Sequence, residues 1–149
     1  MRRWLKWIVA ALAVGFAALQ LTNSPHTNPP TVAGHDLLAT NPPPPEISAL
    51  LKAACYNCHS YETEWPWYSH IAPFSWRITV DVNNGRDALN FSEWPHDHPS
   101  WGRKRWRHIA DRVEDKEMPL PIYTLLHPSA RLTDAQRAEF VQWAKKAGE

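Results

Sequence analysis

The sequence predicts an all-α protein in which one small helical domain follows an N-terminal apolar segment. Three observations predict this class. Apolar residues recur at helical spacing in residues 46–59, 100–114 and 133–147. The one stretch that alternates like a strand, residues 73–85, has no evident partner strand. A chain of 149 residues has room for a single domain of ordinary size.

The N-terminus has the layout of an export signal. Arg2, Arg3 and Lys6 precede an uncharged, mostly apolar run over residues 7–21. This run of 15 residues is short for a spanning helix, which needs about 20 apolar residues. No good small-x-small cleavage site follows it, so an uncleaved signal anchor over residues 1–22 is favoured over a cleaved signal peptide. Either way, the folded part is expected outside the cytoplasm.

Residues 23–45 are rich in Pro, Thr and Asn and end in four consecutive prolines. This composition is typical of an extended tether, in which His26 and His35 would be exposed to solvent. The folded domain is then expected over residues 46–149. Without Arg2, Arg3 and Lys6, the chain has 13 basic and 15 acidic side chains, so the exported part carries a net charge near −2. Nucleic acid is therefore not expected as a partner.

Both cysteines of the chain lie in the stretch Cys55-Tyr-Asn-Cys58-His59. A close cysteine pair can serve a zinc site, a redox dithiol or the covalent attachment of haem. Zinc usually needs four ligands, and a redox dithiol is expected near a βαβ pattern, which is not evident here. At helical spacing Cys55 and Cys58 can reach two vinyl groups while His59 reaches the iron. The pattern favours one covalently attached haem c, with a redox dithiol as the main alternative.

Residues 73–85 alternate like a strand, yet a proline near their start and an Asn-Gly pair at their end favour a helix, which we predict. His96 and His98 lie two apart between prolines and are interpreted as part of a surface loop. The last helix begins with a capping box of Thr133 and Gln136. It is expected to bury Phe140, Val141, Trp143 and Ala144.

The segment after the motif is rich in aromatic residues. We interpret them as core packing, and in a small haem protein this core is also the wall of the cofactor pocket, where one indole N–H can bond to a propionate. The backbone carbonyl of Pro66 or Pro73 is a candidate acceptor for the ring N–H of His59, which would fix the tautomer of the ring. The aromatic residues are Trp65, Trp67, Tyr68, Phe74 and Trp76.

Several blocks of sequence occur together in order: CYNCHS, ETEWPWYSHIAPFSW, DVNNGRDALNFSEW, MPLPIY, LLHPSARLT and a closing helix that ends in a tryptophan. Over residues 28–146 they resemble the bacterial haem-binding domain family, small exported c-type haem proteins that usually carry an N-terminal membrane anchor. The resemblance implies a cytochrome c-like helical domain wrapped around one covalent haem. It implies attachment at Cys55, Cys58 and His59, with Met118 as the second iron ligand, and it implies no reaction.

Met118 suits this role by its position. It lies 59 residues beyond His59, between two predicted helices, and is the only methionine besides the initiator. A thioether is a soft, neutral donor that raises the reduction potential relative to two histidines, which suits an electron carrier. The alternatives are a methionine that only fills a core gap, or another ligand. The rival ligands are His70, which lies nearest the aromatic cluster, His108 and His127.

Two functions follow from these residues. The first is a mono-haem electron carrier with His and Met ligands, not an enzyme, on the periplasmic side of the bacterial inner membrane. The second is a peroxidase-like enzyme or a gas or redox sensor whose sixth ligand is displaceable. The expected partners are a redox protein, the haem attachment machinery and the membrane through residues 7–21. If the signal is cleaved, the protein is instead soluble in the periplasm.

Overall fold

The computed structural model describes residues 2–40, 42–94 and 98–149. Every regular element in these ranges is a helix, which confirms the all-α class. The predicted loop with His96 and His98 falls largely on residues 95–97, which lie outside the described residues.

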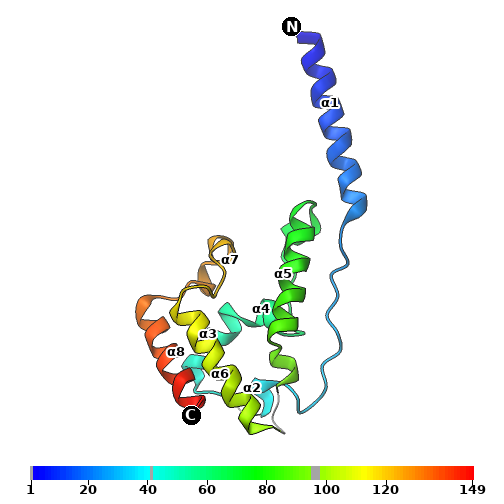
Figure 1. The fold of residues 1–149 in the computed structure, drawn as a ribbon. Helices are drawn as coiled ribbons and strands as arrows, with labels where there is room; N and C mark the ends of the chain where they lie inside the picture. The colour runs from blue at the N-terminus through cyan, green and yellow to red at the C-terminus, as the bar shows by residue number, and fades with distance from the viewer. Residues whose placement is uncertain (1, 41, 95–97) are drawn as a thin grey trace.

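The first helix, α1 (Arg2–Leu19), continues into the 3-10 turn η1 (Gln20–Thr22). Figure 1 shows α1 projecting away from the rest of the chain. The stretch Arg3–Thr22 is long and apolar enough to cross a membrane, with 20 residues and a mean hydropathy of 1.7, and none of it is buried. At about 1.5 Å per residue its length is close to the thickness of a bilayer's hydrocarbon core, about 30 Å. The helix is thus longer than the apolar run of residues 7–21.

The segment expected to be a tether packs along the domain. The side chain of Asn28 donates to the carbonyl oxygen of Thr63 at 2.8 Å. The short helix α2 (Leu37–Thr40) brings Leu37 into the core, where it is 1% exposed. His26, expected in solvent, is instead half-buried between the rings of Trp65 and His70, while His35 is exposed as expected. We call residues 23–36 the strap.

The cysteine motif begins where one helix ends. Helix α3 (Pro45–Ala54) starts with a proline and buries Ile47 and Leu51. It ends at Cys55, whose φ of −124° breaks the helix before the single turn α4 (Tyr56–His59). The motif therefore begins at a break between two helices, whereas the sequence predicted one continuous helix.

The next helix settles the ambiguity of residues 73–85. After the 3-10 turn η2 (Trp67–His70), α5 runs over Phe74–Ala88 as a helix and not a strand. Its buried residues, Ser75, Val82 and Gly85, follow helical spacing, whereas Trp76 and Val80 of the alternating pattern are exposed. The alternating apolar residues therefore do not indicate a strand. Only one side of this helix packs against the domain, so some of the apolar residues stay exposed.

The remaining helices form the second half of the domain. They are η3 (Phe91–Glu93), α6 (Pro99–Glu114), α7 (Pro121–Leu126), η4 (Pro128–Ala130) and α8 (Asp134–Ala147). Helices α6 and α8 pack together, with the rings of Trp106 and Trp143 4.7 Å apart. The predicted capping box of Thr133 and Gln136 is present. Phe140, Val141 and Ala144 are buried as predicted, and Trp143 is partly buried.

The core lies elsewhere than the aromatic segment after the motif. Trp67, Phe74 and Trp76, which were interpreted as core packing, are 75%, 62% and 37% exposed. The core contains instead a series of rings from separate parts of the chain, each in contact with the next, packed among aliphatic side chains. In this series Tyr56 stacks on Phe91, with ring centroids 5.1 Å apart. The series is Tyr56, Phe91, Trp94, Trp106 and Trp143.

Candidate cofactor site

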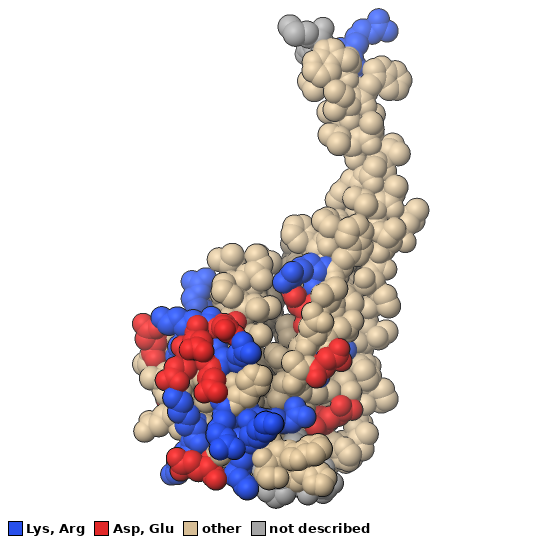
Figure 2. Space-filling view, viewed as in Figure 1, with Lys and Arg blue, Asp and Glu red and all other residues tan. Residues whose placement is uncertain are grey.

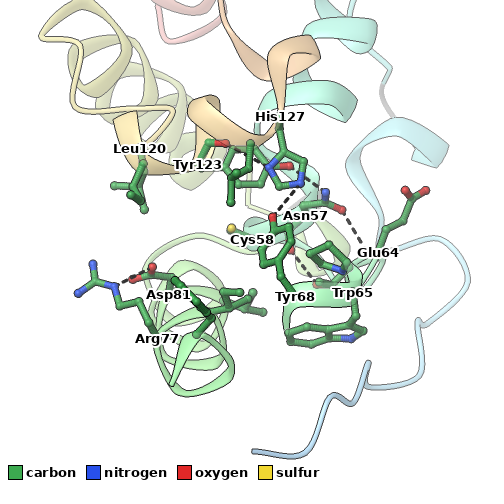
Figure 3. Close-up of a pocket in the computed structure, with 17 residues that line it drawn as sticks. Asn57, Cys58, Glu64, Trp65, Tyr68, Arg77, Asp81, Leu120, Tyr123 and His127 are labelled. Atoms are coloured by element: carbon green, nitrogen blue, oxygen red, sulfur yellow. Dashed lines mark hydrogen bonds and ion pairs between the residues drawn. The ribbon is translucent and has the colours of Figure 1, made fainter. Parts of the chain in front are cut away.

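Three adjoining cavities meet at the cysteine motif. The apolar cavity, of about 320 Å³, lies between α5 and α7. The central cavity, of about 220 Å³, shares Cys58 with it. The α6 cavity, of about 260 Å³, shares His59 and Met118 with the central one. Figure 3 shows Leu120 and Tyr123 across the apolar cavity from Asp81, with Cys58 between them.

We call the three cavities together the cleft, and Cys55, Cys58 and His59 all line it. The backbone N–H groups of Cys58 and His59 donate to the carbonyl oxygen of Cys55 at 3.1 and 2.9 Å, which closes one helical turn. Cys58 and His59 line the central cavity, and Cys55 and His59 line the α6 cavity. His59 therefore lines both cavities, the central one together with Cys58 and the α6 one together with Cys55.

Two backbone carbonyls fix the tautomer of His59. Its Nδ1 lies 2.9 Å from the carbonyl oxygen of Gly85 and 3.1 Å from that of Leu89. Because a carbonyl oxygen only accepts, Nδ1 carries the proton, and the lone pair of the neutral ring is on Nε2. Burial lowers the pKa of His59 and keeps the ring neutral. The expected acceptors, Pro66 or Pro73, were wrong, because the end of α5 and not the loop after the motif reaches the ring.

Gly85 allows this close approach of α5. A Cβ atom at Gly85 would come within 2.6 Å of the carbonyl oxygen of Cys58, closer than real Cβ contacts. Any larger residue would push α5 away from the motif. The Asn84-Gly85 pair, taken from the sequence as a helix stop, is instead the point where the helix packs against Cys58.

The cysteines are half-buried free thiols. Burial raises the pKa of Cys55 to about 12 and that of Cys58 to about 11. Reactive redox dithiols need a lowered pKa, so this environment disfavours the dithiol alternative. Within the described part of the chain, no group of three His, Cys, Asp or Glu side chains is placed to hold a metal ion.

Met118 lies in the turn after α6, beside the same cleft. Its side chain is half-buried, and its backbone N–H donates to the carbonyl oxygen of Arg112 at 3.1 Å. Its carbonyl oxygen accepts from the guanidinium of Arg137 at 3.1 Å. Both the N–H and the carbonyl group of Met118 are therefore hydrogen-bonded, which fixes the turn. Met118 lines the two cavities that His59 also lines.

The three rival histidines differ in position. His108 lines the α6 cavity together with His59 and Met118. His127 lines the apolar cavity, where its Nε2 and the hydroxyl of Tyr68 are 3.2 Å apart. His70 is exposed and packs edge-on against His26, with ring centroids 4.4 Å apart. Of the three, His108 is the rival that shares a cavity with both His59 and Met118.

The two inner residues of the motif have structural roles that sequence reasoning missed. Tyr56 stacks in the core, and burial raises its pKa. The side-chain amide of Asn57 donates to the hydroxyl of Tyr123 at 2.8 Å and so connects the motif to α7. The Asn57 amide oxygen also accepts the backbone N–H of Glu64 at 3.1 Å. No local signal in the sequence points to these distant partners.

The block Asn-Phe-Ser-Glu-Trp, residues 90–94, holds the exit from the motif. The hydroxyl of Ser92 accepts the backbone N–H of Tyr61 at 3.0 Å, and the Asn90 side chain accepts the N–H of Ser92. Phe91 and Trp94 belong to the core. The Ser92 hydroxyl therefore holds a segment that lies 31 residues away in the sequence.

The residues of the cleft suit a flat, mostly apolar cofactor. The apolar cavity is lined mainly by aromatic and aliphatic side chains, among them Ile78, Val82 and Leu120. Trp65 also lines it, and its indole N–H is buried without a partner among the described residues, so a carboxylate of the cofactor would give it one. Cys58, His59 and Met118 offer soft or neutral donors to the central cavity, which Arg77 and Asp81 also line. This donor set is typical of c-type haem ligation.

A family model described as a haem-binding domain matches residues 14–146, which is most of the chain. No curated protein and no solved structure matches the chain.

Proposed function

The chain belongs to the haem-binding domain family, and from this premise we propose that it is a mono-haem c-type cytochrome that carries electrons. The observation that carries the proposal is the geometry of His59. Its Nδ1–H is bonded to two carbonyls and its Nε2 lone pair is left for iron, beside cavities that Met118 also lines. Cys55 and Cys58 would hold the cofactor through two thioether bonds.

Each residue of the site has a separate part in this function. Haem, when bound, supplies a one-electron redox couple. The carbonyls of Gly85 and Leu89 orient the His59 ring and increase its basicity through the Nδ1 hydrogen bond. Arg137 and the backbone of Arg112 hold the turn that presents the Met118 thioether. The apolar side chains of the cleft would keep water away from the bound haem. Solvent exposure of haem is one of the factors that set its reduction potential.

One observation favours the alternative, a peroxidase-like enzyme or a gas or redox sensor. His108 lines the α6 cavity with Met118, and its Nε2 accepts a hydrogen bond from Arg112 Nε at 3.1 Å. An imidazole and a guanidinium side by side are groups that can move or stabilise charge on a small molecule. This pair would act if Met118 left the iron.

Absorption spectra of both oxidation states, taken with and without carbon monoxide, decide between the two functions. A carrier with His and Met ligands is expected to show six-coordinate haem in both states and no carbon monoxide binding by the ferrous protein at neutral pH. Ready binding of carbon monoxide would overturn the carrier and support the alternative. Haem that is not c-type in the spectrum would overturn both.

For location, we propose that α1 stays attached as an anchor in the inner membrane of a bacterium, with the haem domain on the periplasmic side. The length and hydropathy of Arg3–Thr22 support this. N-terminal sequencing of protein purified from its host tests it. A new terminus between about residues 18 and 30 would show cleavage and a soluble periplasmic protein. Haem attachment outside the cytoplasm also requires an attachment machinery, and electron transfer requires a redox protein as partner.

A further inference from the structure

Two polar side chains at the end of the apolar helix hold the haem domain against it. Gln20 forms a pair of hydrogen bonds with Ala72, whose N–H donates to the side-chain oxygen at 3.0 Å and whose carbonyl accepts from the amide at 3.3 Å. Asn23 donates to the carbonyl of His70 at 2.9 Å and accepts the hydroxyl of Ser75 at 2.8 Å. These two side chains satisfy peptide groups of the turn before α5, as a cap would.

A third contact and the strap complete the attachment. The indole N–H of Trp76 donates to the carbonyl oxygen of Thr22 at 2.8 Å. Farther along, the guanidinium of Arg86 donates to the carbonyl of Thr27 at 3.2 Å and to the side chain of Asn28 at 2.8 Å. Residues 70–76 are therefore fixed within hydrogen-bonding distance of the residues that end the apolar helix. Where that helix ends in a bilayer, the start of α5 must lie close to the same level.

Large apolar side chains are exposed at this end of the domain. Phe74 and Ile122 are each 62% exposed and also line the apolar cavity, as does the exposed Leu126. Figure 1 shows the start of α5 and the whole of α7 at the end of the domain from which α1 projects. We call this set the apolar rim: Trp67, Phe74, Ile122, Leu125 and Leu126.

Exposed basic side chains occur at the other end of the domain from the apolar rim. Arg103, Lys104 and Arg107 are exposed in the first half of α6, at the end of the domain away from α1. Figure 2 shows charged side chains over most of the domain, densest on the side away from α1, with one basic and one acidic group near the base of α1. The ion pair of Arg77 and Asp81 also lines the apolar cavity. Exposed apolar side chains gathered beside a cavity mark an interaction site or a ligand-binding groove. The place of the apolar rim beside a helix of membrane-spanning length, with an exposed tryptophan, suits the headgroup region of a bilayer.

We propose that the apolar rim rests in the lipid headgroup region, so that the mouth of the cofactor cleft faces the membrane and the charged end of α6 faces water. This inference rests on the anchoring proposed above. The hydrogen bonds of Gln20 and Asn23 set the depth, and the rim side chains supply the apolar contact. The haem domain is therefore held in one orientation on the bilayer and does not swing on a free tether.

Spin-label accessibility in the full-length haem protein tests the depth of the rim. The haem protein is reconstituted into phosphatidylcholine vesicles with a nitroxide on one introduced thiol, in the variants Phe74→Cys, Ile122→Cys and, as the control, Lys146→Cys in the last turn of α8. The unsubstituted protein reports any labelling of Cys55 or Cys58. Collisions with oxygen, which concentrates in lipid, are compared with collisions with a water-soluble nickel chelate.

Labels at positions 74 and 122 are expected to favour oxygen over nickel several-fold relative to the label at 146. Adding Gln20→Ala and Asn23→Ala to the Phe74→Cys variant is expected to lower that ratio, and an unchanged ratio would overturn the role of the two hydrogen-bonded side chains. If the labels at 74 and 122 are as accessible to nickel as the control while the protein resists alkaline extraction, the rim inference fails and the anchor stands. If alkali extracts the protein, both fail. Mutual broadening of labels at position 74, with neither reagent admitted, would assign the rim to a second copy of the chain and overturn the membrane contact.

Discussion

Gly85 lies directly against Cys58: a Cβ atom on Gly85 would approach the carbonyl oxygen of Cys58 to 2.6 Å. The same residue offers its own carbonyl oxygen to the Nδ1–H of His59 at 2.9 Å. One glycine therefore sets both the distance between α5 and the motif and the orientation of the candidate iron ligand.

Gly85→Ala is expected to destabilise the protein by about 1–3 kcal/mol, because the added methyl group overpacks a backbone contact that cannot shift freely. Gly102→Ala is the matched control, since Gly102 is also helical and its added Cβ would meet Trp94 at an ordinary 3.6 Å. The control is expected to be neutral or to gain up to about 1 kcal/mol of helix propensity. Urea unfolding measures both, and equal stability of the two variants would contradict the role given to Gly85.

Ser92→Ala removes the acceptor of the Tyr61 N–H in a place where Ser92 is 1% exposed. A buried donor without a partner costs about 1–3 kcal/mol, so the midpoint of urea unfolding is expected to fall by a corresponding amount. Ser129→Ala, at an exposed serine, is the control and is expected to stay within about 0.5 kcal/mol of the parent. A loss no larger than that of the control would contradict the role given to the Ser92 hydroxyl.

Arg86→Lys is expected to loosen the strap. The Arg86 guanidinium reaches Ser60 O at 2.9 Å and both Asn28 Oδ1 and Thr63 Oγ1, and a lysine ammonium cannot reproduce this fork. Hydrogen exchange of residues 23–36 should accelerate, while that of α8 should not change. Arg103→Lys, at a side chain without an ion pair among the described residues, is the control. Unchanged exchange in the strap would show that Arg86 does not hold it.

The sequence correctly predicted the features that depend on residues close together in the chain. The helix at α8 and its capping box of Thr133 and Gln136 are confirmed because both depend on neighbouring residues. The acceptors of His59, by contrast, lie 26 and 30 residues away, and the tether prediction overlooked Leu37 because one buried leucine leaves no periodic signal.

For the aromatic segment after the motif, the prediction of core packing was wrong for Trp67, Phe74 and Trp76, which are exposed. Trp65, Tyr68 and Phe74 nevertheless line the apolar cavity, as the predicted wall of a cofactor pocket would.

Replacing both Cys55 and Cys58 with Ala is expected to make haem fully extractable by acidified organic solvent, because no thioether bond would remain. Each single variant keeps one thiol and should retain covalent haem with a shifted absorption band. Denaturing electrophoresis with a haem stain measures retention. Covalent haem in the double variant would overturn the attachment site, since the chain has no other cysteine.

Met118→Ala is expected to open a coordination position on the iron, lower the reduction potential and allow carbon monoxide to bind the ferrous protein, because a thioether stabilises the ferrous state. His70→Ala should leave both the spectrum and the potential unchanged, since His70 is exposed and lies against His26. His108→Ala is the more demanding comparison, because His108 lines a cavity with Met118 and His59. If Met118→Ala keeps the parent spectrum and potential while His108→Ala loses them, His108 is the sixth ligand and Met118 only fills the turn after α6.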